Sequence, residues 1–300
     1  MKKWFKAARL RTLPLSVSGI LVGSAYAYYQ GYENYTILIL ALLTTLGLQI
    51  LSNFANDYGD GVKGTDTNRI GEKRLVASGE ITSKQMKNAV VITAIITFII
   101  ALLLIYFAFE KENFALSLIF IILGISAIGA AIKYTVGKNA YGYSGFGDVF
   151  VFIFFGLVSV LGSNYLYTHT LDYKLLLPAF SIGMLSVAVL NLNNMRDIEN
   201  DKLSNKNTLV VKIGLKNAII YQRFLIVFAI ILMSVFLFIL NHTFNALLFS
   251  LNLGYFFVHN TIISKAKKYE DFDPELKKIA LFTFFCSLYL SLNLIYLANK

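Results

Sequence analysis

Long apolar stretches separated by shorter polar ones occupy most of this 300-residue chain. A helix crosses the roughly 30 Å hydrocarbon core of a bilayer with about 17 to 25 mostly apolar residues. Such stretches form helices in lipid, because a helix satisfies the hydrogen bonds of its own backbone. The pattern predicts nine spanning helices, at 13–30, 35–55, 86–108, 113–132, 148–167, 174–192, 219–240, 244–263 and 277–297.

The composition favours a membrane protein over a soluble or disordered one. Hydrophobic residues make up 57% of the chain, charged residues make up 15%, and the mean hydropathy is +0.64. Soluble domains carry about 25% charged residues, and disordered chains lack the 25 Phe and 18 Tyr found here. The single cysteine, Cys286, excludes an intramolecular disulfide framework. We therefore expect an all-α integral membrane protein, with residues 1–300 forming one polytopic bundle.

The basic residues predict how this bundle is oriented. Long charged segments follow the even-numbered spans, at 56–85, 193–218 and 264–276. With a cytoplasmic N-terminus, all but Lys111, Lys174 and Lys300 of the 27 Lys and Arg residues lie on the cytoplasmic side. This bias predicts an N-terminus inside and a C-terminus outside, in the cell's inner membrane. Loops beside an anionic leaflet account for the net charge of +10, so the charge does not indicate a nucleic-acid partner.

The first span has a second interpretation, as a signal peptide. Met1 to Arg11 is basic, an apolar stretch follows, and Ala25-Tyr26-Ala27 is similar to a cleavage site. Eight further spans leave the chain without need of a cleaved export signal, so we favour a retained first helix.

Acidic and amide side chains gather where the second and sixth spans end. Asn56 and Asp60 are four residues apart, and the same spacing separates Asn193, Asp197 and Asp201. Four residues are about one helical turn, so each set is expected to line one face of its helix. Both helices run inward, so the two sets are predicted to meet on the cytoplasmic side and form one site.

Carboxylates at a helix C-terminus are repelled by the helix dipole, which costs about 0.3–1 kcal/mol for each carboxylate. These acids therefore need positive charge nearby. Mg²⁺ takes carboxylate oxygens and commonly binds substrate phosphates as well. Basic residues alternate with the acids, at Lys63, Arg69, Lys73, Arg74, Arg196, Lys202, Lys206 and Lys212. One such acid alone usually caps a helix or pairs with a base, whereas two matched sets favour a functional site for a metal-bound polyanion.

Both motifs resemble those of the UbiA-type intramembrane prenyltransferases. Asn56-Asp57-Tyr58-Gly59-Asp60 is similar to the first Asp-rich motif of that family, and Asp197-Ile198-Glu199-Asn200-Asp201 is similar to the second. Gly64 stands where the first motif usually has a third acid, and Asp66 follows it. The string from Asn56 to Asp66 is most similar to members that prenylate 1,4-dihydroxy-2-naphthoate in menaquinone synthesis. Arg11-Thr12-Leu13-Pro14, Arg69-Ile70-Gly71, Gly145-Phe146-Gly147-Asp148 and Lys206-Asn207-Thr208-Leu209 share the resemblance.

The resemblance implies transfer of a polyprenyl group from polyprenyl diphosphate to 1,4-dihydroxy-2-naphthoate with decarboxylation, giving demethylmenaquinone. Other aromatic acceptors and a haem vinyl group are the alternatives within the family. Asp60, Asp197 and Asp201 are the implied catalytic residues, and the implied Mg²⁺ ligands are Asp57, Asp60, Asp66, Asp197 and Asp201. The implied substrate-binding residues are Asn56, Arg69, Lys73, Arg74, Asn193, Lys206 and Lys212. Aromatic faces stabilise an allylic cation, and the candidates are Tyr134, Tyr143, Phe152 and Phe155.

A secondary transporter is the alternative from a different class, since transporters combine internal repeats with polar groups at the bilayer midplane. The interiors of the nine predicted spans contain almost no acid, and the acids gather at one interface. This distribution favours the enzyme. Neither the tail length nor an oligomeric state follows from these residues.

Overall fold

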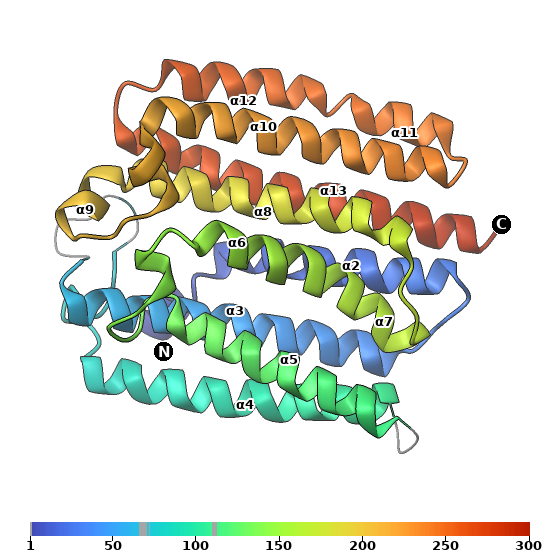
Figure 1. The fold of residues 1–300 in the computed structure, drawn as a ribbon, viewed down its shortest axis with the longest axis horizontal. Helices are drawn as coiled ribbons and strands as arrows, with labels where there is room; N and C mark the ends of the chain where they lie inside the picture. The colour runs from blue at the N-terminus through green and yellow to red at the C-terminus, as the bar shows by residue number, and fades with distance from the viewer. Residues whose placement is uncertain (1, 66–70, 72, 110–112) are drawn as a thin grey trace.

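The computed structural model describes residues 2–65, 71, 73–109 and 113–300, and every regular element among them is helical. The long helices lie side by side with their connections at the two ends of the bundle (Figure 1). They are α2 (Leu13–Tyr29), α3 (Tyr35–Lys63), α4 (Ser83–Phe109), α5 (Phe114–Lys133), α8 (Leu176–Arg196), α10 (Leu209–Ile239) and α13 (Phe272–Ala298). The shorter elements are α1 (Lys2–Ala8), η1 (Leu10–Thr12), η2 (Tyr141–Tyr143), α6 (Gly147–Val151), η3 (Phe152–Gly162), α7 (Ser163–Thr168), η4 (Tyr173–Leu175), α9 (Ile198–Leu203), α11 (Thr243–Ser250), α12 (Leu253–Lys265) and η5 (Tyr269–Asp271).

Within the described ranges, 8 helical segments are long and apolar enough to cross a membrane. Four of these segments combine elements: α6 with η3 and α7, η4 with α8, α11 with α12, and η5 with α13. The first predicted span corresponds to α2, which has 17 residues and runs beside the others. The all-helical fold is confirmed, and nine crossings remain a prediction.

Small residues bring α2, η3 and α8 into close contact. A Cβ atom on Gly156 of η3 would lie 2.5 Å from the carbonyl oxygen of Ala179 and 2.8 Å from the Cα of Gly183, both on α8. Helices in lipid associate through such close backbone packing, since burial of apolar surface does not drive them together. The fifth predicted span is not a uniform α-helix, because residues 152–162, which pack against α8, are π-helical.

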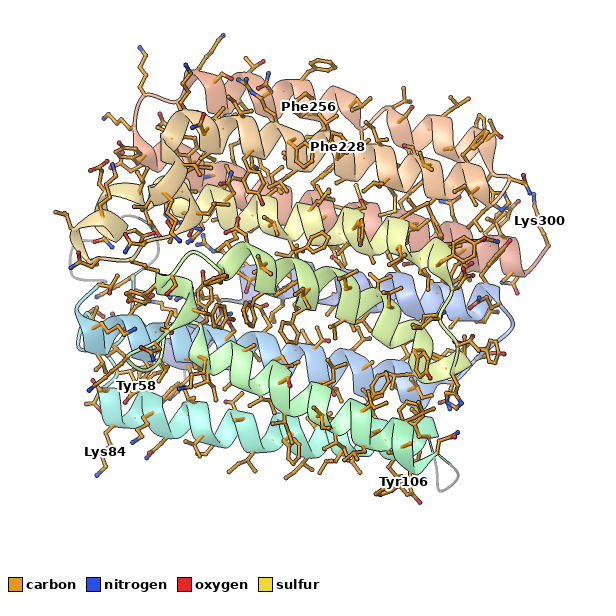
Figure 2. All side chains as sticks on the ribbon, in the orientation of Figure 1. Tyr58, Lys84, Tyr106, Phe228, Phe256 and Lys300 are labelled. Carbon is orange, nitrogen blue, oxygen red and sulfur yellow. The ribbon has the colours of Figure 1, made fainter. Side chains whose placement is uncertain are left out.

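The outer helices present apolar side chains to their surroundings. Ile92, Ile99 and Ile122 are each more than half exposed, as suits contact with lipid. Figure 2 shows carbon along the middle of the bundle, with nitrogen gathered toward the end that carries Lys84. The fold therefore has an apolar belt and a strongly polar end.

The two acidic motifs lie at the same end of the bundle, where α3 and α8 finish beside α9 (Figure 1). The second motif does not follow a single helix, since α8 ends at Arg196 and Asp201 belongs to α9. The backbone still continues the four-residue pattern, because the Asp197 N–H bonds the Asn193 carbonyl at 3.1 Å and the Asp201 N–H bonds the Asp197 carbonyl at 2.8 Å. The break thus keeps the spacing while turning the chain across the end of the bundle.

Candidate active site

The first motif occupies the last turns of α3, and a glycine ends that helix. Gly64 has a φ of 75°, and its N–H bonds the backbone carbonyls of Asp60 and Gly61. This left-handed conformation closes many helices, and it strains every residue with a Cβ. The absence of an acid at position 64 therefore has a physical reason, since glycine readily adopts the left-handed conformation that ends α3 after Lys63.

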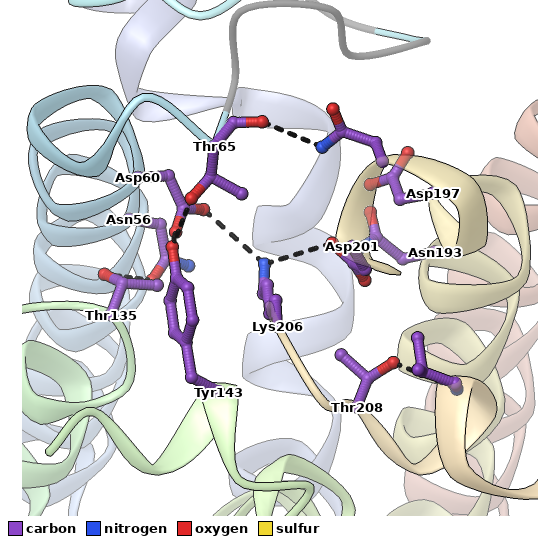
Figure 3. A network of polar contacts seen from close by, with 12 residues as sticks. Asn56, Asp60, Thr65, Thr135, Tyr143, Asn193, Asp197, Asp201, Lys206 and Thr208 are labelled. Carbon is purple, nitrogen blue, oxygen red and sulfur yellow. Dashed lines mark hydrogen bonds and ion pairs between the residues drawn. The ribbon is translucent and has the colours of Figure 1, made fainter. Parts of the chain in front are cut away.

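Asp60 lies at the centre of the polar end, with 2% of its surface exposed. The Tyr143 hydroxyl donates a hydrogen bond to its Oδ1 at 2.8 Å and lies 2.6 Å from the Thr65 Oγ1 (Figure 3). Burial, together with the charge of Asp60, raises the pKa of Tyr143 well above its usual range. The tyrosine therefore stays protonated and fixes the orientation of the Asp60 carboxylate.

Lys206 connects the two motifs. Its Nζ lies 3.7 Å from Asp60 Oδ2 and 3.8 Å from Asp201 Oδ1 (Figure 3). The Lys206 N–H bonds the Asp201 carbonyl at 2.8 Å, which folds the segment after α9 back toward the site. A second link is made by Asn200, whose Nδ2 donates to the Thr65 carbonyl at 2.8 Å. The carboxylates of α3 and α9 are thus brought together around one ammonium group.

Asp197 is held by its neighbour in the sequence. Nε and Nη2 of Arg196 donate to the two carboxylate oxygens of Asp197 at 2.8 and 2.9 Å. The same Nη2 donates to Asn193 Oδ1 at 2.8 Å. This two-pronged contact is the strong form of an arginine–carboxylate pair, and it joins Asn193 and Asp197 into one unit.

Asp57 and Asn56 make local contacts beside this centre. The oxygens of Asp57 accept hydrogen bonds from the backbone N–H groups of Leu75 and Val76 at 3.1 and 3.0 Å, so Asp57 holds the segment that returns toward α4. Asn56 Oδ1 accepts from the Thr135 hydroxyl at 3.2 Å, which attaches α3 to the end of α5.

The remaining predicted residues are distributed more widely. Arg74 is buried, whereas Lys73 is exposed and pairs with Glu80 at 2.8 Å. Lys212 is exposed and donates to the Ser144 carbonyl at 2.7 Å. Tyr134 packs edge-on against Tyr141, and Phe152 packs against Phe180. Two predicted site residues, Asp66 and Arg69, lie outside the residues that the structure describes.

Several contacts at the site were not predicted from the sequence. Lys63 Nζ lies 3.7 Å from the centroid of the Tyr143 ring, so this aromatic face already contacts a cation. Thr65 and Asn200 join the motifs through the hydrogen bond described above. Asp273 contacts Arg196 from a position 77 residues away in the sequence, and no spacing rule indicates such a pair. The sequence does hold one indication of Thr65, because this residue directly follows Gly64, the glycine that ends α3 beside the first motif.

The donor set fits a divalent metal. Carboxylate oxygens are the ligands that Mg²⁺ prefers, and those of Asp60 and Asp201 already share one cation, the Lys206 ammonium. Among residues 2–65, 71, 73–109 and 113–300, no three His, Cys, Asp or Glu side chains are already arranged as a metal cluster. Asp60, Asp197 and Asp201 stay the predicted ligands for such an ion.

A sequence profile described as "UbiA prenyltransferase family" matches residues 16–290. The chain belongs to the UbiA prenyltransferase family. This confirms the resemblance seen in the motifs and, with the apolar helices, identifies an integral membrane protein. Two relatives are called 1,4-dihydroxy-2-naphthoate octaprenyltransferase. The one from Escherichia coli (strain K12) is 46% identical over 78% of this chain and 75% of its own.

The other relative, from Haemophilus influenzae, is 39% identical over 98% of this chain and 96% of its own. Among solved structures, a UbiA homolog from Archaeoglobus fulgidus bound to GPP and Mg²⁺ superposes with a TM-score of 0.70. The superposition covers 98% of this chain and 99% of that one at 13% identity. It shows that this protein has the fold of the UbiA family from end to end.

Proposed function

We propose that this UbiA-family protein transfers a polyprenyl group from a polyprenyl diphosphate to 1,4-dihydroxy-2-naphthoate. The observation that carries the proposal is the joining of two buried acidic motifs at one end of an apolar bundle through Lys206. A charged head group and a long apolar tail need these two environments side by side. The name shared by the bacterial relatives supports the naphthoate acceptor.

In this proposal the polar end binds the diphosphate and its metal. The carboxylates of Asp60, Asp197 and Asp201 and the amide oxygens of Asn56 and Asn193 form the part of the site that would bind the metal. The basic side chains assigned to the diphosphate oxygens are Lys206, Arg74 and Lys212. Arg69 is added because Arg69-Ile70-Gly71 resembles the corresponding stretch of the family. Asp66 stays a candidate metal ligand, supported only by the resemblance of the string from Asn56 to Asp66 to the family's first motif. Asp57 bonds the backbone of Leu75 and Val76, Lys73 pairs with Glu80, and both stay predicted site residues.

Positive charge at the head group drives the reaction. Mg²⁺, when bound, neutralises the diphosphate and so favours its departure. Lys206 and Arg74 add fixed positive charge where negative charge develops as the allylic C–O bond breaks. The electron pair of that bond leaves with the diphosphate, and the allylic carbon forms a bond to the naphthalene ring. The carboxylate then leaves as CO₂, and its electron pair restores the aromatic ring, giving demethylmenaquinone as its quinol.

The proposal includes an orientation in the membrane. The site faces the cytoplasm, the N-terminus is inside, the C-terminus is outside, and nine helices cross the inner membrane as a single domain formed by residues 1–300. The basic residues that flank the polar end support this orientation.

A product assay tests the proposal. Purified protein in liposomes receives octaprenyl diphosphate, Mg²⁺ and 1,4-dihydroxy-2-naphthoate labelled in its carboxyl group. We expect equal amounts of demethylmenaquinone and labelled CO₂, and none from the Asp60→Asn variant. Prenylation of 4-hydroxybenzoate in place of the naphthoate would assign a different acceptor. Folded protein that prenylates neither compound would contradict the proposal.

A further inference from the structure

Arg196 is one of the largest fully buried side chains in the described part of the protein, with 2% of its surface exposed. All three of its guanidinium nitrogens bond to acceptors. Nε and Nη2 bond Asp197, Nη2 also bonds Asn193, and Nη1 bonds Asp273 of α13. A buried cation of this kind is stable only with such complete pairing. Its position is therefore fixed jointly by the second motif and by α13.

Asp273 continues the chain of contacts to the N-terminal segment. Its second oxygen lies 3.8 Å from Arg11 Nη1. The residue after Arg11 is Thr12, whose Oγ1 accepts hydrogen bonds from Gln49 and Asn53 of α3 at 3.1 and 3.2 Å. A ring of polar contacts thus runs from α3 through the N-terminal segment and α13 to α8. Lys206 and Asn200 close this ring across the site.

A glycine packs against the guanidinium from the side of the first motif. Gly71 has a φ of 100°, and a Cβ atom there would lie 3.0 Å from the Arg196 Cζ. The guanidinium therefore lies against Gly71. Enclosed in this way, Arg196 holds the Asp197 carboxylate in one orientation.

We infer that Arg196 and Asp273 are positioning residues that orient the Asp197 carboxylate for the metal and the diphosphate. The inference rests on the proposed function. Asp197 belongs to the predicted site, but its orientation is set by Arg196, which Asp273 secures from the last helix. Partners that orient a metal-binding carboxylate typically contribute 10- to 100-fold to metal affinity. The binding site for the diphosphate therefore depends on α13, which carries neither acidic motif.

Metal binding without turnover tests this inference. Full-length protein in detergent is titrated with Mn²⁺ and inorganic pyrophosphate, and bound Mn²⁺ is measured by electron paramagnetic resonance. We expect Asp273→Asn and Arg196→Gln each to raise the dissociation constant for Mn²⁺ by about tenfold or more. The double variant should be no worse than the weaker-binding single one, because the two residues act as a unit. Arg196→Lys should recover little of the affinity, because an ammonium group cannot reproduce the two-pronged contact.

Glu275→Gln is the matched control. Glu275 is also on α13, is more deeply buried than Asp273, and pairs with His259 at 2.6 Å and Lys278 at 2.6 Å, away from the acidic motifs. Its loss should lower thermal stability and leave Mn²⁺ affinity unchanged. Wild-type affinity in folded Asp273→Asn and Arg196→Gln, or an equal loss in Glu275→Gln, would overturn the inference. Wild-type protein that binds no Mn²⁺ with pyrophosphate would instead contradict the proposed function.

Discussion

The Lys206 ammonium is shared by two carboxylates that come from opposite halves of the chain. Removing one partner of a buried charge pair leaves the other charge uncompensated, which costs more than the pair itself contributes. Lys206 comes from the segment between α9 and α10, outside both acidic motifs, yet it is the residue through which they meet. The properties of the site therefore depend on a single side chain of the connecting segment.

Replacing Lys206 separates its role from that of Lys212. A hydrogen bond from Lys206 to the charged diphosphate would contribute about 1.5–3 kcal/mol, so Lys206→Gln should lower kcat/KM for the prenyl diphosphate roughly 10- to 100-fold. The exposed Lys212 should lose less than about tenfold as Lys212→Gln, because solvent screens an exposed charge. The measurement is a rate series against prenyl diphosphate concentration. Equal losses in the two variants would contradict the central place of Lys206.

The Tyr143 hydroxyl is expected to stay protonated at the pH of the reaction, and the pH dependence of kcat/KM tests this. Its pKa is raised above the ordinary value of 10.0 by burial and by Asp60, so the hydroxyl stays neutral and donates throughout the neutral and mildly alkaline range. Tyr143→Phe removes this hydrogen bond to a charged group and should lower kcat/KM roughly tenfold or more. Profiles of kcat/KM between about pH 7 and about pH 9.5 should keep the same shape in both proteins. An alkaline decline in the wild type that disappears in Tyr143→Phe would show that the tyrosine titrates there.

At the scale of elements, close packing between helices supports the site. η3 and α8 approach through Gly156 and Gly183, and α8 leads directly into the second motif. The distance between these helices is set by the absence of side chains, so it responds to a single methyl group.

Gly156→Ala should therefore destabilise the protein. Overpacking of this kind costs about 1–3 kcal/mol, and the midpoint of thermal unfolding should fall. Gly124→Ala is the matched control on α5, because a Cβ atom there would meet nothing within 4 Å. It should keep or raise the midpoint, since alanine favours a helix by about 0.5–1 kcal/mol over glycine. Both variants are heated in detergent, and the folded fraction that remains at each temperature is measured by size-exclusion chromatography. A lower midpoint in Gly124→Ala alone would contradict the prediction.

The helices and the site were predictable from the sequence to different degrees. Hydropathy located the apolar segments, because the bilayer imposes one length and one polarity on all of them. It did not indicate that residues 152–162, which lie against α8, are π-helical. The spacing of Asn193, Asp197 and Asp201 predicted that they share one face of a single helix, whereas the helix is interrupted at Asp197. Asp273 could not be found at all, since its pairing with Arg196 depends on how distant helices pack.

For the whole molecule, the described termini lie at opposite ends of the bundle. Asn53 bonds the Ala8 carbonyl at 2.8 Å near the acidic motifs, and Tyr28 bonds Asn299 at 3.3 Å at the far end. This separation agrees with an odd number of crossings. It also makes the proposed orientation testable with reagents that do not cross membranes.

Cysteine labelling tests that orientation. Cys286 is the chain's one cysteine and is buried, so a Cys286→Ser background is close to the natural protein. In intact cells, an impermeant maleimide should label Lys174→Cys and Lys300→Cys, and it should label Lys73→Cys and Lys138→Cys only after permeabilisation. The reverse pattern would place the acidic motifs outside the cell and exclude a cytoplasmic site.

Helix α13 extends from Asp273, beside the acidic motifs, to the far end of the bundle, where Asn299 meets Tyr28. A fluorescent protein fused after Lys300 is therefore kept a full helix length from the carboxylates. One fused before Lys2 precedes helix α1, whose Ala8 carbonyl accepts the hydrogen bond from Asn53 near the acidic motifs. Reporters for imaging or purification belong on the C-terminal end of this enzyme.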